Sequence, residues 1–270
     1  MKIEARVTFI GAGNMGEAML KGLLNAGVPA RNLKIMELFK ARSQYIQKTY
    51  KVKKAQNMAD ALTAEAVVVA VKPKEVDNVV RLIAESKRPP PLIISIAAGV
   101  PLSNFLDKLG PGARVIRVMP NTPALVGASV SAYYAGPGVR GEDLTLTETI
   151  LNAIGACHHL MDESLLDAVT GLSGSGPAYV FVVIEALADA GVKLGLSREL
   201  SLSLAAHTVA GAGKMAAVSG EHPALLKDKV ASPAGTTIEG LAELERAGFR
   251  AALINAVEAA AMRARELGNK

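Results

Sequence analysis

Three glycines near the beginning of the chain have the spacing of a phosphate-binding turn. Residues 7–16 read Val-Thr-Phe-Ile-Gly-Ala-Gly-Asn-Met-Gly, so an apolar strand leads directly into a glycine-rich turn. In this pattern the first glycine permits a tight turn, the second lets the backbone approach a pyrophosphate, and the third lets helix and strand pack closely. The start of the helix offers free N–H groups and a partial positive charge. A dinucleotide site is therefore predicted at Gly11, Ala12, Gly13, Asn14, Met15 and Gly16. The alternative is a plain strand–turn–helix without a ligand.

Charged residues follow the second predicted strand and bear on the type of dinucleotide. Glu37 lies 21 residues beyond Gly16, where an acidic side chain can hold a ribose 2′-hydroxyl, which favours NAD. Lys40 and Arg42 follow at once and can pair with a 2′-phosphate, which favours NADP. A solvated charge cluster at a helix start is the third interpretation. The sequence leaves the choice between NADH and NADPH open.

Other candidate residues come after later strands, because ligands in such sheets bind at the carboxyl ends of the strands. Lys72 can reach the phosphate side of the cleft or be an exposed lysine at a strand end, and the proline after it starts the next helix. Ala97 belongs to a run of small residues that leaves room for a ring. Two prolines stiffen residues 119–123, which either present backbone groups to a nicotinamide or form a turn without a ligand.

A second polar turn lies in the other half of the chain, at residues 232–237. The Ser-Pro-Ala-Gly turn feeds a predicted helix, and Thr236 with Glu239 fits a reciprocal capping box at its start. Free amides, hydroxyls and the helix dipole would together bind a carboxylate, although taken alone the motif fits an ordinary capped helix better. The polar stretch 170–179 is a candidate for a further wall of the site.

Alternating strands and helices must position these residues up to about residue 160. The run 66–71 is apolar throughout, which is typical of a parallel strand covered on both faces. The alternation predicts a doubly wound, Rossmann-like α/β domain at residues 1–160. The predicted strands are 6–10, 33–36, 66–71, 92–96, 114–118 and 129–135, and the predicted helices between them are 15–26, 39–50, 73–86 and 102–108.

Residues 161–270 are predicted to form an all-helical second domain. Alanine and leucine dominate there, and residues 178–191, 197–219 and 249–267 have helical patterns. The last helix is apolar on too many sides to lie on the surface of a monomer. We therefore expect the helical domain to form a homodimer, with a compact bundle within one chain as the alternative.

Composition limits the cellular setting. At 270 residues and 50% hydrophobic content the chain can bury a sizeable core. Cys157 is the single cysteine, which excludes a disulfide framework and favours a reducing compartment. Residues 1–6 lack the apolar core of a signal peptide, and no uninterrupted apolar run reaches the roughly 18–20 residues of a membrane helix. We expect a soluble, cytoplasmic protein without a membrane partner.

Charge and histidines indicate neither nucleic acid nor metal. Residues 1–160 hold 20 Lys and Arg against 12 Asp and Glu, whereas residues 161–270 hold 10 against 13. The basic half carries the glycine-rich turn, which suits a phosphate-bearing ligand. The run Lys48–Lys54 has one aromatic residue and is interpreted as a solvated loop rather than a nucleic-acid patch. His158 and His159 have no further ligands at metal-binding spacing, so no metal site is expected.

Taken together, these motifs resemble the pyrroline-5-carboxylate reductase family, in order and over nearly the whole chain. The matching stretches are Phe-Ile-Gly-Ala-Gly-Asn-Met-Gly at 9–16, Ala-Val-Lys-Pro at 70–73, Arg-Val-Met-Pro-Asn-Thr-Pro at 117–123, Gly-Leu-Ser-Gly-Ser-Gly-Pro-Ala-Tyr at 171–179, Leu-Lys-Asp-Lys-Val-Ala-Ser-Pro-Ala-Gly-Thr-Thr at 226–237 and residues 247–259. The resemblance implies an enzyme that uses NADPH or NADH to reduce a small cyclic imine, 1-pyrroline-5-carboxylate, to L-proline. This is the last step of proline biosynthesis. It also implies a homodimer and allows a higher assembly, a pentamer of dimers.

The resemblance assigns roles to individual residues. Ser232 and the amides of Gly235 and Thr236 would hold the substrate carboxylate, and Thr237 would act as the catalytic residue at the ring nitrogen. Ala234 stands where the family has glycine, and an alanine with a positive φ would be strained. The cofactor contacts that the resemblance implies are Asn57, Ala70, Val71, Lys72, Pro73, Met119, Pro120 and Asn121.

Two other functions remain open at this point. A β-hydroxyacid dehydrogenase or general imine reductase has a similar pair of domains. Such dehydrogenases place a catalytic lysine on a helix of the second domain, and Lys193 and Lys214 lie in no motif of that kind. A non-catalytic nucleotide sensor would keep the dinucleotide pocket but would not need a carboxylate-binding turn at 232–237.

Overall fold

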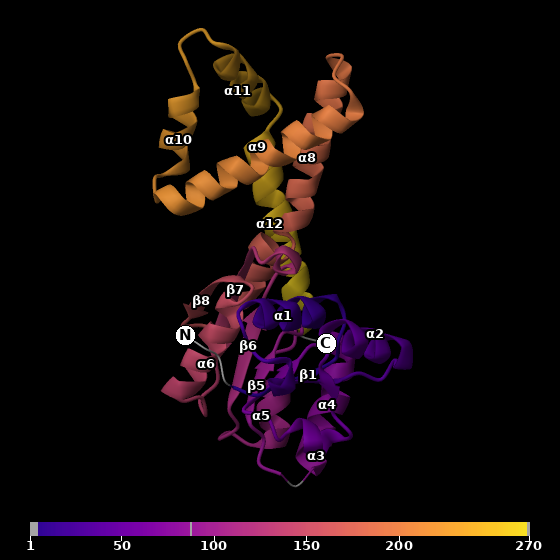
Figure 1. The fold of residues 1–270 in the computed structure, drawn as a ribbon. Coiled ribbons are helices and arrows are strands. Elements are labelled where there is room, and N and C mark those ends of the chain that lie inside the picture. The colour runs from indigo at the N-terminus through magenta and orange to yellow at the C-terminus, as the bar shows by residue number, and fades with distance from the viewer. Residues whose placement is uncertain (1–4, 87, 269–270) are drawn as a thin grey trace. The chain divides into compact units, whose positions relative to one another are not determined.

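The computed structural model describes residues 5–86 and 88–268, which form a mixed sheet flanked by helices and a separate group of helices (Figure 1). The elements up to residue 174 are β1 Val7–Ile10, α1 Asn14–Asn25, η1 Ala30–Asn32, β2 Leu33–Met36, α2 Lys40–Tyr50, β3 Lys53–Lys54, α3 Met58–Ala61, β4 Ala66–Val69, α4 Pro73–Glu85, β5 Leu92–Ser95, α5 Ser103–Leu109, β6 Val115–Met119, η2 Thr122–Val126, β7 Ser129–Ala135, α6 Gly141–Asn152, β8 Gly155–Leu160, α7 Leu165–Val169 and the π-helical turn η3 Thr170–Gly174. The helices that follow are α8 Gly176–Lys193, α9 Arg198–Ser219, α10 Pro223–Val230, α11 Thr236–Arg246 and α12 Phe249–Gly268.

The eight strands form one sheet in the order β3-β2-β1-β4-β5-β6-β7-β8. Strands β1 to β6 are parallel, which confirms the predicted Rossmann-like fold. The chain goes from β1 to one side of the sheet and later returns to the other side at β4. The crevice beside β1 is therefore the switch point where ligands bind in such sheets.

The far edge of the sheet departs from a purely parallel arrangement. Strand β7 runs antiparallel to β6, and β8 runs parallel to β7. A parallel neighbour needs a crossover of a dozen or more residues, whereas β6 and β7 are joined by residues 120–128, which contain only the short turn η2. The short connection therefore reverses the chain direction.

Both faces of the sheet are covered, which explains the uniformly apolar strands. Val7 and Phe9 of β1 point to one core, shared with α1 and α6. Ile10 points to the opposite core, shared with α4 and α5. All four residues of β4 are buried. A strand between two helical layers has no solvent-facing side, so its residues do not alternate between apolar and polar.

Several elements differ from the sequence-based expectation. The basic run Lys48–Lys54 is not a loop throughout, because α2 extends to Tyr50 and Lys53–Lys54 pair with β2 as an edge strand. Its lysines are nevertheless exposed, as predicted. Helix α6 and strand β8 were not predicted. The alternation in β8, which contains His158 and His159, is weak, and the threonines of α6 obscure its apolar face.

Contacts divide the chain into two compact units, which are described separately. The first unit comprises residues up to Ser175 and again from Glu258, and the second is Gly176–Val257. In the first unit, the C-terminal part of α12 lies against the loop after β5, where a Cβ on Gly99 would be 3.6 Å from Leu267. Arg265 lies 3.8 Å from the carboxylate of Asp167, which also lies 3.7 Å from the buried guanidinium of Arg117. The domain boundary expected at residue 160 stays a prediction.

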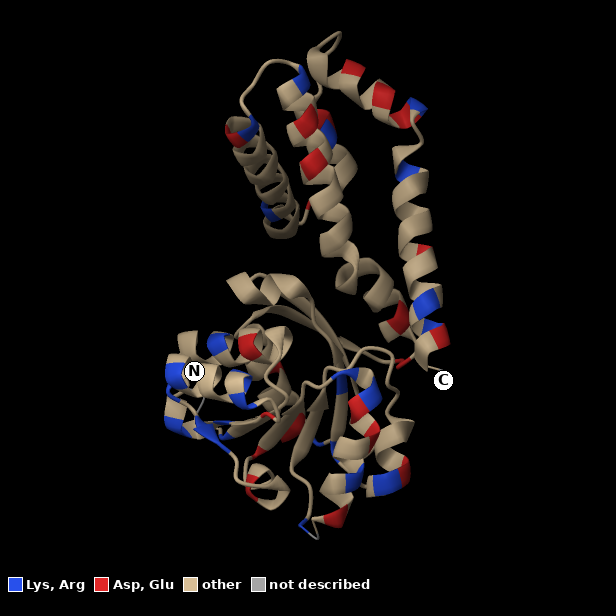
Figure 2. Ribbon diagram, turned by 90° about the vertical axis from the view of Figure 1, so that its right-hand side faces the viewer, with Lys and Arg blue, Asp and Glu red and all other residues tan. Residues whose placement is uncertain are grey.

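The second unit has little buried surface of its own. Among its described residues only Ala188, Ser201 and Ala205 are buried, although α8 and α9 pack side by side. Large apolar side chains, such as Phe181 and Leu204, are more than half exposed. Figure 2 shows long helical stretches without charge in this unit. A compact bundle within one chain would bury these residues, so the structure contradicts that alternative and is consistent with association.

Among the described residues, one helical stretch, Leu165–Lys193, is long and apolar enough to span a membrane, judged by length and composition alone. A single such stretch is weak evidence, since helices of soluble proteins can meet the same criteria.

Gly155 at the start of β8 provides a test of the far edge of the sheet. Its φ is +149°, and a Cβ there would lie 1.9 Å from the carbonyl oxygen of Ser129. We predict that Gly155→Ala lowers the free energy of unfolding by about 3 kcal/mol. Gly112→Ala, in open space, should change it by less than about 0.5 kcal/mol. Equal denaturant midpoints for the two variants would contradict this account.

Candidate functional site

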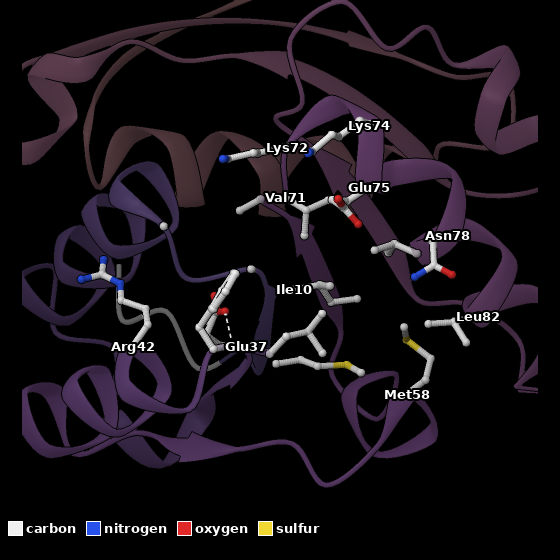
Figure 3. A pocket seen from close by; sticks show the side chains of 17 residues that line it. Ile10, Glu37, Arg42, Met58, Val71, Lys72, Lys74, Glu75, Asn78 and Leu82 are labelled. Carbon is white, nitrogen blue, oxygen red and sulfur yellow. Dashed lines mark hydrogen bonds between the residues drawn. The ribbon is translucent and has the colours of Figure 1, made fainter.

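A cavity of about 560 Å³ lies at the carboxyl ends of β1, β2 and β4, at the switch point of the sheet (Figure 3). Its size is in the range of small-molecule sites. Every residue around it belongs to the first unit. The lining residues are Ile10, Gly11, Gly13, Met36, Glu37, Leu38, Phe39, Arg42, Met58, Ala70, Val71, Lys72, Lys74, Glu75, Asn78, Val79 and Leu82.

Each of the three glycines in the turn after β1 is favoured there for a different structural reason. Gly11 has φ +89°, and a Cβ on it would lie 2.6 Å from the carbonyl oxygen of Ala70. A Cβ on Gly16 would lie 2.8 Å from the carbonyl oxygen of Gly11. No atom lies within 4 Å of a Cβ placed on Gly13, which borders the cavity. A side chain at Gly13 would therefore fill space that a phosphate group can enter.

The N-terminus of α1 fits an anionic group. Gly13 is the N-cap residue of α1, and no side chain of the described residues caps the helix. The first amides of the helix are thus without a side-chain acceptor, and they carry the positive end of the helix dipole. Pyrophosphate is the group that such a turn holds in dinucleotide-binding folds.

Glu37 is held firmly at the end of β2. It is 9% exposed. Its Oε2 accepts a hydrogen bond from the Ala12 amide at 2.8 Å, and its Oε1 accepts one from the Phe39 amide at 2.9 Å. The carboxylate thereby connects the glycine turn to the start of α2. The Glu37 side chain lines the cavity. The next two residues, Leu38 and Phe39, also line it and are exposed apolar residues.

Arg42 belongs to a small polar network behind Glu37. Its Nε donates to the carbonyl oxygen of Ala12 at 2.6 Å, and Nη2 donates to Glu17 at 2.5 Å. Tyr50 donates its hydroxyl to the other oxygen of Glu17 at 2.7 Å. Burial raises the pKa of Glu17, but the hydrogen bonds from Tyr50 and Arg42 outweigh it and bring the pKa below its usual value. Burial and the hydrogen bond to Glu17 raise the pKa of Tyr50 to about 12.

The opposite wall of the cavity is apolar with a polar rim. Met58 and Leu82 form its apolar end, and Asn78 and Glu75 lie at the edge (Figure 3). Lys72 is exposed as the N-cap of α4, and Pro73 occupies the first turn of that helix, as predicted. An apolar slot with a few polar groups suits a purine base, so the cavity fits the nucleotide end of a dinucleotide.

Six of the predicted cofactor residues line this cavity: Gly11, Gly13, Glu37, Ala70, Val71 and Lys72. The lining residues that were missed come mainly from α3 and α4, namely Met58, Lys74, Glu75, Asn78, Val79 and Leu82. Their signal in the sequence is only helical amphipathicity, which does not distinguish a pocket from a core. The predicted residues outside the lining are Ala12, Asn14, Met15, Gly16, Lys40, Asn57, Pro73, Ala97, Met119, Pro120 and Asn121.

Two of the residues outside the lining have clear structural partners. The side chain of Asn57 caps α3 by accepting the Asp60 amide at 2.9 Å. Asn121 is buried, and its Oδ1 accepts hydrogen bonds from the Ser129 hydroxyl and the Val130 amide, both at 3.0 Å. Its Nδ2 donates to the Ser173 carbonyl oxygen at 3.1 Å. The Asn121 side chain therefore fixes its own loop against β7 and η3.

The capping box predicted at Thr236 and Glu239 in the second unit is wrong. Helix α11 starts with Gly235 as N-cap, and no side chain among the described residues caps it. Thr236 and Glu239 are therefore the first and fourth helical residues, one position too late for the reciprocal pair. The first amides of α11 consequently have no side-chain acceptor, as in α1.

Close packing shapes this turn. The Gly235 amide donates to the Ser232 carbonyl oxygen at 3.1 Å, and a Cβ on Gly235 would lie 2.2 Å from Ser232 Oγ. Ala234 has φ +53°, so the strain anticipated for an alanine at this position is present. Ser232 and Thr236 are exposed, and Thr237 is half-buried. The hydroxyl of Ser232 thus lies directly beside the backbone that opens α11.

Comparison with known families places both halves of the chain. The family model described as pyrroline-5-carboxylate reductase dimerisation matches residues 163–267. The one described as NADP oxidoreductase coenzyme F420-dependent matches residues 6–99. A pyrroline-5-carboxylate reductase of Synechocystis is 46% identical over 99% of this chain and 100% of its own length. The chain belongs to the pyrroline-5-carboxylate reductase family. The resemblance drawn from the motifs is thereby confirmed, and with it an oxidoreductase that acts on a CH–NH group with NAD(P)H.

Solved structures of the family agree in fold. A pyrroline-5-carboxylate reductase of Coxiella burnetii has a TM-score of 0.91 at 34% identity, covering 97% of this chain and 98% of its own. The enzyme of Plasmodium falciparum, with NADP bound, has a TM-score of 0.87 at 34% identity, covering 99% of both chains. The predicted fold class, a Rossmann-like domain followed by a helical dimerisation domain, is confirmed.

Gly13 allows the cradle to be tested without disturbing the fold. We predict that Gly13→Ala keeps the free energy of unfolding within about 0.5 kcal/mol, because its φ of −66° suits alanine and nothing lies near the new methyl group. Dinucleotide affinity, measured by calorimetry, should fall about tenfold or more, since the methyl group enters the phosphate space. Unchanged affinity would show that the turn does not carry the ligand.

Proposed function

We propose that the chain catalyses the NAD(P)H-dependent reduction of 1-pyrroline-5-carboxylate to L-proline, the last step of proline biosynthesis. Family membership over nearly the full length is the observation that carries the proposal. Two uncapped helix starts support it, because one suits a pyrophosphate and the other a carboxylate.

We assign the substrate carboxylate to the turn that opens α11. The Thr236 amide and the hydroxyl of Ser232 are the proposed donors. The Gly235 amide, which donates to the Ser232 carbonyl oxygen, would have to share that hydrogen bond with the substrate. The close approach of Ser232 Oγ to the backbone of Gly235 supports this grouping, since it brings hydroxyl and amides to one place. The helix dipole adds a favourable interaction with the negative charge.

Thr237 is the proposed catalytic residue. A protonated cyclic imine is already electrophilic, so the protein needs no strong acid and mainly has to orient the ring. The Thr237 hydroxyl would accept a hydrogen bond from the ring N–H and keep the ring oriented while the nitrogen becomes an amine. Orientation of this kind can contribute several kcal/mol to catalysis.

The cofactor would be held by the glycine turn, Glu37 and the wall formed by Ala70, Val71 and Lys72. When bound, reduced nicotinamide supplies the hydride. We assign the loop Met119, Pro120 and Asn121 to its nicotinamide side, supported by the hydrogen bonds that fix Asn121. Asn14, Met15, Asn57, Pro73 and Ala97 remain proposed contacts with either cofactor, and Lys40 only with a 2′-phosphate.

The second unit is proposed to associate as a homodimer, and the dimers to assemble further as pentamers of dimers. The apolar, exposed helices and the matched dimerisation family support the dimer. A cytoplasmic location is proposed from the single cysteine.

Steady-state oxidation of NADH and of NADPH with 1-pyrroline-5-carboxylate tests the reaction directly. Six-membered imines are compared in the same assay, and 3-hydroxy acids are tested in the opposite direction, through reduction of NAD⁺ and NADP⁺. Turnover of 1-pyrroline-5-carboxylate well above that of these other compounds is expected. Dinucleotide binding without turnover of any imine would instead indicate a sensor.

Thr237→Ala should lower kcat about 100-fold, the order of loss expected when a reacting ring is no longer held in position. The thermal unfolding temperature should change little, since Thr237 is only half-buried. Thr145→Ala, on α6, is the matched control. Full activity of Thr237→Ala at saturating substrate would remove the assigned role.

Ser232→Ala should act on substrate binding instead. We predict a KM for 1-pyrroline-5-carboxylate about tenfold higher, equivalent to one hydrogen bond to a charged group, with kcat nearly unchanged. A lower kcat at unchanged KM would move Ser232 from carboxylate binding to the chemical step.

A further inference from the structure

We propose that Glu37 makes this chain prefer NADH to NADPH, with Glu17 keeping Arg42 away from the role of phosphate ligand. The inference deepens the proposed function and rests on it, because it concerns the cofactor of that same reaction. The two cofactors differ only by a phosphate on the adenosine 2′-oxygen. The groups at the end of β2 therefore decide between them.

The Glu37 carboxylate is placed to accept ribose hydroxyl groups. The amides of Ala12 and Phe39 each occupy one lone-pair site, one on each oxygen. An ionised carboxylate has about four such sites, so acceptor capacity remains on both oxygens. Because the two amides hold the carboxylate in place and it is nearly buried, it cannot easily swing away from a ligand in the cavity.

The same carboxylate disfavours a phosphate. An ionised 2′-phosphate can accept hydrogen bonds but has no hydrogen to donate to the Glu37 carboxylate. It also brings negative charge close to that carboxylate. A fixed carboxylate beside it gives repulsion without a compensating hydrogen bond. NADPH would bind well only if a nearby cationic side chain paired with the negative charge of its 2′-phosphate.

Arg42 is the nearest candidate cation, and it is already engaged. Its guanidinium donates to the Ala12 carbonyl oxygen and to Glu17, and it lies 5.3 Å from the centre of the Tyr45 ring. Glu17 is in turn held by Tyr50. Turning Arg42 toward a 2′-phosphate would break both hydrogen bonds and leave Glu17 partly buried without its cation.

The other cations around the cavity lie elsewhere. Figure 3 shows Lys72 and Lys74 on the opposite side of the cavity from Glu37 and Arg42. Lys40, which the sequence offered as a phosphate partner, is exposed and is not among the lining residues. Among the described lining residues, Arg42 is therefore the cation next to Glu37. The Plasmodium relative has NADP bound, so family membership alone does not set the preference.

Binding measurements on the full chain test the inference without turnover. Dissociation constants for NAD⁺ and NADP⁺ would be measured by calorimetry for the native chain, Glu37→Gln, Glu17→Gln and Glu85→Gln. The last variant makes the same chemical change on the exposed side of α4 and is the control. Thermal unfolding of each variant confirms that it is folded.

The native chain and Glu85→Gln should bind NAD⁺ at least tenfold more tightly than NADP⁺. Glu37→Gln should reduce this ratio at least tenfold, with weaker binding of NAD⁺ and tighter binding of NADP⁺. Glu17→Gln should improve NADP⁺ binding several-fold and leave NAD⁺ nearly unchanged, because it releases Arg42. If Glu37→Gln does not fold, Glu17→Gln still provides the second measurement.

Equal or tighter binding of NADP⁺ by the native chain would overturn the inference, as would an unchanged ratio in both cavity variants. These failures differ from failure of the proposed function. A chain that reduces 1-pyrroline-5-carboxylate with NADPH as the better cofactor would retain the function and lose the preference. A chain that prefers NAD⁺ but reduces no imine would retain the preference and lose the function.

Discussion

The nucleotide end of the molecule depends on one close approach between two pieces of backbone. The turn after β1 meets the end of β4 so tightly that Gly11 has no room for a side chain beside the Ala70 carbonyl oxygen. The turn constrained by this contact leads into α1, whose start has no side-chain cap among the described residues. Glu37 then joins the same turn to β2 through the Ala12 amide. Three strand ends are thus held in one arrangement before any ligand arrives.

Much of this arrangement could be predicted from the sequence, because it follows from local rules. The spacing of Gly11, Gly13 and Gly16 predicted the turn, and the apolar runs predicted six of the strands within one or two residues. What could not be predicted depends on tertiary contacts. Strand β3 exists only by pairing with β2, and the start of α11 shifted by one residue because Gly235, not Thr236, is the cap. The apolar residues of α3 and α4 at the cavity look like ordinary core residues in the sequence.

The two units solve the problem of burying apolar surface differently. The sheet of the first unit has a complete core on each face, so its strands and helices satisfy one another. The second unit leaves most of its apolar side chains exposed, and its polar turn at residues 232–237 lies on helices with little core of their own. Exposed apolar surface of this extent is stabilised by association with another chain.

The path of α12 has a consequence for how the protein can be dissected. Its final turns belong to the first unit, where Ala264 is buried and Arg265 approaches Asp167. The second unit is therefore inserted into the first rather than appended to it. Truncating the chain after the sheet would remove the end of α12, from Glu258 onward, which packs as part of the first unit. An independent nucleotide-binding fragment would instead require a short linker in place of Gly176–Val257, joining Ser175 to Glu258.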